Sequence, residues 1–223
     1  MRSGKKRKTG VLGGAFNPPH FGHLRPAQEV MELLDMQQVL FLPSGGHPLK
    51  KGSIVAANHR LAMAKVAIAN TPKFTICDLD VKRSGISYSV DTLAELARLY
   101  PDFELVFMVG GDILTELHLW KDYHKILDHA HLLMMVRPGV ETDLTSGDIA
   151  DGVRGFLQKN LVEHPEELDA KNNGFYGFIQ IPVTPVDISA TQIRAMVAKG
   201  MDCKKHTPDG VVDYIMEHGL YLT

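Results

Sequence analysis

The sequence predicts an α/β protein in which helices cover both faces of a doubly wound parallel sheet. Short apolar segments alternate along the chain with longer amphipathic segments, the order typical of β-α-β units. The segments VLFL (39–42) and LVFMV (105–109) are apolar at successive positions, which predicts strands that are buried on both faces. Because parallel strands need crossover connections, the amphipathic segments between them are expected to be the helices that cover the sheet.

The individual elements follow from these patterns in chain order. Strands are expected at 10–12, 38–42, 74–79, 104–109, 131–136 and 178–183. Helices are expected at 24–36, 55–70, 89–100, 113–117 together with 123–129, and 191–199. A final helix has clear end signals, with Thr207 as its N-cap, Pro208 at the first helical position and Gly219 directly after its end.

Two segments lie outside this alternation. From 138 to 177 the sequence becomes polar and rich in glycine, with helical pieces at 149–161 and 166–170, which we interpret as an insertion rather than a second domain. Residues 1–8 contain five cations and lead into a strand without the apolar stretch of a signal peptide. The chain is therefore expected to be a solvated basic tail (1–8) followed by one domain (9–223).

Charge and cysteine content exclude several classes of protein. The chain has 24 Lys and Arg against 26 Asp and Glu, so the part after the basic tail carries a formal charge of −7. A body this acidic lacks the basic face of a nucleic-acid binder, and no apolar run approaches the roughly 18 residues that cross a bilayer. Cys77 and Cys203 are the two cysteines and have no paired spacing, which predicts a reducing cytoplasm.

The first candidate binding segment is GGAFNPPHFGHL (13–24), which follows a strand and leads into a helix. In a doubly wound sheet ligands bind at the carboxyl ends of the strands, and a helix start there receives phosphate through its N–H groups and dipole. Gly13 and Gly14 let a ligand approach the backbone closely. His20 and His23, spaced i and i+3, share one face of the incoming turn. Two imidazoles beside a helix start suit a polyphosphate, as hydrogen-bond donors when neutral and as cations when protonated.

The second candidate segment is ISATQIR (188–194), which follows the last expected strand. Ser189 has the position of an N-cap, Thr191 lies in the first turn, and Arg194 lies one turn further on. Two hydroxyls and a guanidinium at a helix start form a second position that can receive an anion. Two such helix starts in one sheet indicate a single ligand whose phosphate chain extends between them.

Other catalytic signatures are absent from the sequence. It contains no G-x-G-x-x-G, no G-x-x-x-x-G-K-[ST], no G-x-S-x-G and no H-E-x-x-H. Histidines cluster in one stretch without zinc spacing, so we expect surface or hydrogen-bonded core residues at His118, His124, His129 and His131. No metal site built from side chains alone is predicted.

Together, GGAFNPPHFGHL and ISATQIR resemble the H-x-G-H nucleotidyltransferase superfamily, whose members transfer AMP or CMP from a nucleoside triphosphate. The finer resemblance is to the bacterial nicotinate-nucleotide adenylyltransferases. It covers nearly the whole chain, through GISYSVDTL (85–93), VGGDIL (109–114), HLWKDYHKIL (118–127), VRPG (136–139) and the final YIMEHGLYLT. The resemblance implies a Rossmann-like sheet of the nucleotidyltransferase type. It also implies transfer of AMP from ATP to nicotinate mononucleotide, which gives deamido-NAD and pyrophosphate.

The resemblance also implies roles for individual residues. His20, His23 and Arg194 would be catalytic, with the histidines on the triphosphate and Arg194 at its far end. The residues implied to bind ATP are Gly13, Gly14, Ala15, Phe16, Lys50, Gly110, Asp112, Arg137, Ile188, Ser189 and Thr191. The residues implied to bind the nicotinate group are Tyr88, Ser89, Trp120 and Lys121. Within that second set the ring would stack on Trp120, and Ser89 and the N–H of Lys121 would hold the carboxylate. Mg²⁺ would be bound through the ATP phosphates. Whether the protein forms a homodimer is left open by the sequence.

The chain departs from the family pattern in two regions. Serine stands at 89 where threonine is common, and lysine stands at 121 where an aromatic residue is common. The loop after the second strand reads His47-Pro48-Leu49-Lys50 in place of P-P-H-[KR]. The changes at 89 and 121 keep the hydroxyl and the backbone N–H that the family uses. The change at 47–50 leaves the phosphate contacts of that loop undefined, and His47 is the candidate to replace the missing histidine.

Two kinds of alternative remain at this stage. Within the superfamily, the chain resembles nicotinamide-mononucleotide and pantetheine-phosphate adenylyltransferases less closely, and the latter are typically shorter and without the 138–177 insertion. Outside enzymes, a nucleotide sensor or RNA-binding protein of the same fold is supported by the basic tail alone. The intact histidines and Arg194 favour the enzyme.

Overall fold

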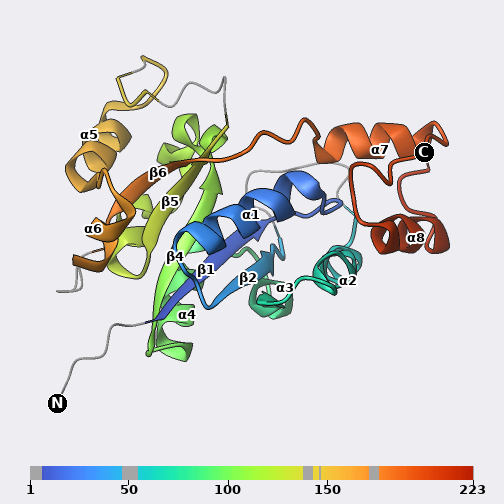
Figure 1. Ribbon diagram of the computed structural model, residues 1–223, viewed down its shortest axis with the longest axis horizontal. Helices are drawn as coiled ribbons and strands as arrows, with labels where there is room; N and C mark the ends of the chain where they lie inside the picture. Colours follow the sequence, from blue (N-terminus) through green and yellow to red (C-terminus); the bar gives the residue numbers. More distant parts are fainter. Residues whose placement is uncertain (1–6, 47–54, 138–142, 146, 171–175, 223) are drawn as a thin grey trace.

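A computed structural model describes residues 7–46, 55–137, 143–145, 147–170 and 176–222 of the chain (Figure 1). Its centre is a six-stranded sheet in the order β3-β2-β1-β4-β5-β6, with every neighbouring pair parallel. The strands are β1 Arg7–Gly14, β2 Gln38–Pro43, β3 Phe74–Ile76, β4 Phe103–Gly110, β5 His131–Val136 and β6 Phe178–Pro182. The expected fold class, a doubly wound parallel sheet, is confirmed.

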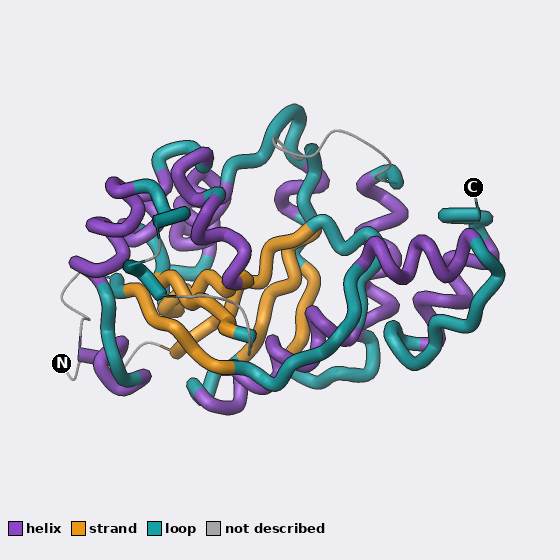
Figure 2. Tube along the Cα trace, turned by 90° about the horizontal axis from the view of Figure 1, so that it is seen from above, coloured by secondary structure: helices purple, strands orange, loops and turns teal. Residues whose placement is uncertain are grey.

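The helices lie between these strands in sequence. The α-helices are α1 Phe21–Leu33, α2 Ala57–Ile68, α3 Leu79–Lys82, α4 Ser89–Leu99, α5 Asp151–Asn160, α6 Pro165–Ala170, α7 Ala190–Ala198 and α8 Asp209–Glu217. Three 3₁₀ helices follow β4, namely η1 Gly111–Thr115, η2 Leu117–Leu119 and η3 Tyr123–Asp128. In Figures 1 and 2, α7 and α8 lie beyond the carboxyl ends of β1 and β2, and α8 packs on α2.

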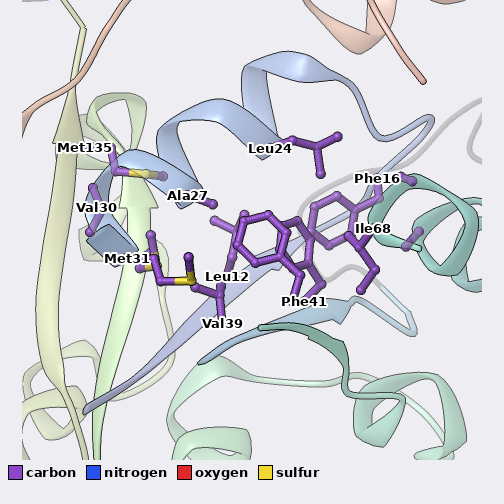
Figure 3. Close-up of a cluster of buried hydrophobic side chains, with 14 of the residues drawn as sticks. Leu12, Phe16, Leu24, Ala27, Val30, Met31, Val39, Phe41, Ile68 and Met135 are labelled. Carbon is purple, nitrogen blue, oxygen red and sulfur yellow. The ribbon is translucent and has the colours of Figure 1, made fainter. Parts of the chain in front are cut away.

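The sheet is buried on both faces, as the apolar strands predict. Neighbouring residues of β1 point to opposite sides: Leu12 joins the cluster under α1, α2, α7 and α8, and Val11 joins the cluster under α4, α5 and the 3₁₀ helices. The same division occurs in β4, between Met108 and Phe107. Figure 3 shows the first cluster, in which Leu12 and Phe41 face helix α1. Two cores therefore fix the sheet and leave the loops at its carboxyl edge to form a site.

The topological switch point of the sheet lies between β1 and β4. The chain continues from β1 to β2 on one side, whereas β4 and β5 extend the sheet on the other. Connections that leave neighbouring strands in opposite directions open a crevice at the carboxyl ends, where ligands bind in folds of this kind. The loops after Gly14 and Gly110 border this position, so the structure places GGAFNPPHFGHL where the sequence predicts it.

The amino-terminal boundary differs from the expectation. Arg7 and Lys8, expected in the solvated tail, are the first residues of β1 and pair with Phe103 and Glu104 of β4. The backbone N–H of Gln37 also donates to the Lys8 carbonyl at 2.9 Å, and Lys8 is buried. The tail assignment is wrong for these two residues, because backbone pairing with β4 continues the ladder despite the charged side chains. Residues 1–6 lie outside the described part.

Thr207 does not cap the last helix. Its hydroxyl is buried and donates to the Pro19 carbonyl at 2.8 Å, which ties this segment to the loop before α1. Pro208 is the N-cap of α8, because its carbonyl accepts from the N–H groups of Val211 and Val212. At the other end Gly219 follows the helix with φ +59°, which confirms its expected position.

The expected helices near 113–117 and 123–129 are 3₁₀ rather than α-helical. Their turns close with i→i+3 bonds, such as Trp120 N–H to the Leu117 carbonyl at 3.0 Å. Asp122 has φ +45°, which separates η2 from η3. Short turns of this type hold side chains less firmly than a long helix does. The insertion contains α5 and α6, as predicted.

Candidate active site

The two histidines of the first loop hold each other in place at the start of α1. His20 is the N-cap, and its Nδ1 accepts from the N–H of Gly22 at 3.1 Å. The His23 Nδ1 accepts in return from the His20 N–H at 3.2 Å, which completes a capping box. Their ring centroids are 3.8 Å apart. Because Nδ1 accepts in both rings, each neutral imidazole carries its proton on Nε2, the nitrogen that can donate to an anion.

Electrostatics keep His20 neutral. Burial, and then the positive charge of Arg137, lower the pKa of the His20 imidazole from 6.5 to about 4. The ring is 4% exposed, which agrees with burial as the main cause. Of the two states that the sequence left open, the structure therefore favours a neutral hydrogen-bond donor at neutral pH.

Glycine and phenylalanine define the rest of this loop. A Cβ at Gly22 would lie 2.9 Å from the His20 ring, so the position of the capping imidazole depends on glycine there, and 3.4 Å from the Ile188 carbonyl, which is close to ordinary contact. The Phe16 ring is buried against Phe41 and His23, with centroids 5.7 and 5.1 Å away. Phe16 itself has φ +47°. Because the ring packs inward, its role at the site can only be through the backbone, and that role stays a prediction.

The second helix start is joined directly to the first loop. Ser189 caps α7, as predicted, and forms a capping box with Gln192. The Arg194 guanidinium donates to the Thr191 hydroxyl at 3.1 Å and to the backbone carbonyl of Asn17 at 2.8 Å. The structure thus brings together the two segments that the sequence assigned to one ligand.

Sequence reasoning missed three residues that support the first loop. Arg60 of α2 is buried and donates to the Ala15 carbonyl at 2.8 Å. The Tyr221 hydroxyl donates to Oδ1 of Asn17 at 2.7 Å, and burial raises the pKa of that tyrosine. The sequence does offer a signal for Arg60, because it lies on the apolar face of 57–68 and a buried cation needs several hydrogen-bond acceptors. Tyr221 and Asn17 gave no such signal.

The remaining residues assigned to ATP lie at the ends of β4 and β5. Gly110 ends β4, and a Cβ there would collide with the carboxylate of Asp112, which is exposed. Arg137 follows β5, is exposed, and acts electrostatically on His20. Lys50 and His47 lie outside the described residues.

The residues assigned to nicotinate form a second group around the start of α4. Tyr88 is the residue before α4 and Ser89 is its first residue. The Lys121 ammonium lies 4.9 Å from the centre of the Tyr88 ring and 2.8 Å from a carboxylate oxygen of Asp91. This exposed ion pair joins the turn that carries Lys121 to the helix that carries Ser89. It also raises the pKa of Lys121, chiefly through its hydrogen bond to Asp91.

Trp120 connects this second group to the sheet. Its half-buried ring lies 6.1 Å from the ring of Phe107 in β4, centroid to centroid. A Cβ at Gly13 would lie 3.5 Å from that same phenylalanine. Phe107 therefore lies between the end of β1 and Trp120. Through it, the residues assigned to the phosphates and those assigned to nicotinate are connected.

Metal-ligating clusters and membrane-spanning helices are both absent from the described residues. In that part of the chain, no three His, Cys, Asp or Glu side chains gather into a group that could hold a metal ion. None of its helices is long and apolar enough to span a bilayer. His131, expected as a hydrogen-bonded core residue, is buried with Nε2 2.9 Å from Glu104 and Nδ1 accepting from the N–H of Gly177.

Comparison with known proteins gives the family. A cytidylyltransferase-like family model matches residues 11–196. A probable nicotinate-nucleotide adenylyltransferase of Herpetosiphon aurantiacus is 34% identical over 216 residues, 97% of this chain and 99% of the relative. The relative of that name in Thermomicrobium roseum is 38% identical over 217 residues, 97% of this chain and 92% of the relative. The chain belongs to the nicotinate-nucleotide adenylyltransferase family.

Solved structures agree on the fold. The nicotinic acid mononucleotide adenylyltransferase of Plasmodium falciparum, complexed with NaAD, has a TM-score of 0.71 at 18% identity and covers 96% of this chain and 97% of its own. The same enzyme complexed with APC has a TM-score of 0.69. The resemblance of the sequence to the nicotinate-nucleotide adenylyltransferase family, and the nucleotidyltransferase fold it implies, are confirmed.

Proposed function

We propose that this protein transfers AMP from MgATP to nicotinate mononucleotide, forming deamido-NAD and pyrophosphate in NAD biosynthesis. The contact that carries the proposal is the 2.8 Å hydrogen bond from Arg194 to the Asn17 carbonyl. It unites two phosphate-receiving helix starts at the switch point of the sheet. Relatives that match nearly the whole chain are named for this activity.

The chemistry needs no nucleophilic side chain. A phosphate oxygen of the mononucleotide attacks the α-phosphorus of ATP in line, and pyrophosphate leaves on the opposite side. The protein positions the two phosphates and stabilises the charge that develops between them. His20 and His23 donate from Nε2 to oxygens of the α-phosphate and the leaving group, and Arg194 binds the far end of the triphosphate.

The nucleotide is held mainly by backbone and by residues at the strand ends. The backbone of residues 13–16 lines the phosphates in this proposal, which is supported by the fixed conformation of the loop: its Ala15 and Asn17 carbonyls accept from Arg60 and Arg194. Gly110 and Asp112 lie at the adenosine ribose. The other groups placed around ATP are Lys50, Arg137, Ile188, Ser189 and Thr191. Mg²⁺ enters on the triphosphate as part of the substrate.

The nicotinate group is placed between the start of α4 and the turn after η2. Its ring stacks on Trp120, with Tyr88 beside it. The Ser89 hydroxyl and the Lys121 N–H donate to the carboxylate, and charge-assisted bonds of this kind are roughly twice as strong as neutral ones. An amide would turn an N–H₂ group toward one of these donors, and such a mismatch costs about 1–3 kcal/mol. The site is therefore proposed to prefer the acid by about 5- to 150-fold.

The organisation and compartment of the chain complete the proposal. Residues 7–223 act as one domain, which begins with β1 and contains the insertion at 138–177, and the reaction takes place in the cytoplasm. The second point is supported by Cys77 and Cys203, which are both free thiols.

The direct test compares two substrates in one assay. The protein is mixed with MgATP and either nicotinate or nicotinamide mononucleotide, and pyrophosphate release is followed while Trp120 fluorescence reports binding. Pyrophosphate release with the acid, and quenching at concentrations at least about fivefold lower than for the amide, are expected. A protein that binds ATP but releases no pyrophosphate with either substrate would be a binding protein. Equal titration midpoints for acid and amide would contradict the assigned carboxylate contacts.

A further inference from the structure

Arg60 is the most heavily hydrogen-bonded buried cation in the described part of the chain. It lies in α2 and is 2% exposed. Its guanidinium and Nε make five hydrogen bonds, and four of the acceptors are backbone carbonyls. A planar fork with five donors is the side chain that can reach several carbonyls at once.

The bonds of Arg60 connect two loops at the carboxyl edge of the sheet. Nη1 donates to the Ala15 carbonyl at 2.8 Å, in the loop after β1. Nη2 donates to the carbonyls of Ser44 and Gly45, at 2.6 and 2.9 Å, directly after β2. A fourth carbonyl, that of Val55, accepts from Nε at 3.1 Å. The ends of β1 and β2 are already paired in the sheet, and Arg60 joins the loops that continue beyond them.

The segment after β2 continues toward the proposed nicotinate side. Gly46 forms a parallel bridge with Ile86, two residues before Tyr88. A Cβ at Gly45 would collide with the carbonyl of Asp80, so the contact between the two segments is close. Arg60 thus links the loop of the proposed ATP phosphates to the segment that leads into α4.

The charge of Arg60 is balanced by these dipoles rather than by an acid. No carboxylate in the part of the chain that the structure describes forms an ion pair with it, and burial lowers the pKa of its guanidinium. Holding a buried cation without a counter-ion is unfavourable unless every donor is used. An apolar residue would fill this position of α2 at less energetic cost, so the carbonyl bonds are what the arginine provides.

We infer that Arg60 is a positioning residue for adenylyl transfer, which holds the ATP loop at a fixed distance from the segment leading to the nicotinate mononucleotide. The inference rests on the proposed function. It concerns the alignment of the two substrates, because the residue itself is buried behind the loops. Misplacement of reacting groups by about 1 Å lowers a rate on the order of 10²-fold, even when each substrate still binds.

The test uses two variants with a control on the same helix. Arg60→Met removes the charge and all five bonds, whereas Arg60→Lys keeps the charge but offers a single nitrogen. Both are expected to lower kcat on the order of 10²-fold. The Kd of ATP and of nicotinate mononucleotide, each measured alone, is expected to change by less than about threefold. The control Met63→Ala truncates a fully buried residue of α2 and is expected to lower the melting temperature without changing kcat of the folded protein.

The outcomes separate alignment from charge and from stability. Full kcat in Arg60→Lys would show that charge alone matters, and full kcat in both variants would show a purely structural role. A loss of kcat in Met63→Ala as large as in Arg60→Met would trace the effect to general weakening of α2.

Variants are assayed below their melting temperatures, with trimethylamine N-oxide where needed to stabilise the folded state. Arg60 variants that fold in neither condition would overturn the inference in favour of a folding role. Absence of turnover in the wild type would instead contradict the proposed function, and the inference with it.

Discussion

The two ends of the candidate site are held by different forces. At the phosphate end, the loop that carries His20 is fixed by hydrogen bonds from Arg60 in α2 and Arg194 in α7. At the nicotinate end, the turn that carries Trp120 consists of short 3₁₀ helices and is tied to α4 by the exposed Lys121–Asp91 pair. Buried hydrogen bonds hold geometry firmly, whereas exposed ion pairs contribute little and are screened by salt.

This difference separates chemistry from substrate choice. The phosphate end keeps the H-x-G-H histidines and the ISATQIR segment, because the transfer needs donors at fixed positions. Its one departure from the family pattern is the loop at 47–50, which lies outside the described residues. The departures at Ser89 and Lys121 both lie at the nicotinate end, where a hydroxyl and a backbone N–H are all that the proposed contacts require. Changes at the phosphate end are therefore expected to reduce turnover strongly, and changes at the nicotinate end to alter affinity mildly.

The largest effect is expected at His20. His20→Asn keeps an N-cap acceptor for the Gly22 N–H but removes the Nε2 donor, so kcat should fall on the order of 10²–10³-fold with little loss of stability. His20→Ala also loses the cap, which costs about 1 kcal/mol of stability. The exposed His118→Ala is the matched control. Near-wild-type turnover in His20→Asn would show that the imidazole only caps α1.

The second effect is a pH dependence of stability. The pKa of His20 is about 4 in the folded protein and 6.5 when unperturbed, so folding favours the neutral ring. The stabilisation is present above pH 6.5 and is lost as the pH falls toward 4, because the unfolded chain takes up the proton first. Between about pH 7 and 4.5 the wild type should lose about 2 kcal/mol more free energy of unfolding than His20→Asn. Urea denaturation at the two pH values measures the free energy of unfolding of both proteins. An equal loss in the wild type and in His20→Asn would contradict a buried neutral His20.

The third effect concerns Arg194. Arg194→Lys should raise the KM for ATP on the order of tenfold, because one ammonium cannot bind the Asn17 carbonyl, the Thr191 hydroxyl and a phosphate together. Initial rates at varied ATP measure this. If lysine restored the wild-type KM, Arg194 would be a surface residue with no part in phosphate binding.

The smallest effect is expected at the nicotinate end. Asp91→Asn removes the exposed pair with Lys121 and should raise the KM for nicotinate mononucleotide by no more than about threefold. The difference should vanish in about 1 M salt, where the wild type is screened to the same degree. A change as large as that of His20→Asn would show that the two ends are equally rigid.

The sequence predicts the parts of this molecule that repeat a local pattern. The apolar runs in β2 and β4 identify buried strands, and Ser189 as an N-cap marks the start of α7. The paired helix starts indicate a ligand with a phosphate chain. These features depend on neighbours in sequence, which is why they can be read from it.

Contacts between distant segments could not be predicted in this way. Thr207 has the right residue type and position for an N-cap, yet its hydroxyl binds Pro19, 188 positions away in sequence. Arg60 and Tyr221 reach the first loop from α2 and from the end of the chain. His20 was assigned to a ligand from its motif, while its second role as a helix cap depends on its backbone conformation.

Formation of the dinucleotide tests the central claim most directly. Wild type and His20→Asn are each incubated with MgATP and nicotinate mononucleotide, and the products are identified by mass spectrometry and quantified against time. We expect equimolar deamido-NAD and pyrophosphate from the wild type, and a rate lower on the order of 10²–10³-fold from His20→Asn. ADP with phosphate as products, or equal rates from the two proteins, would contradict it.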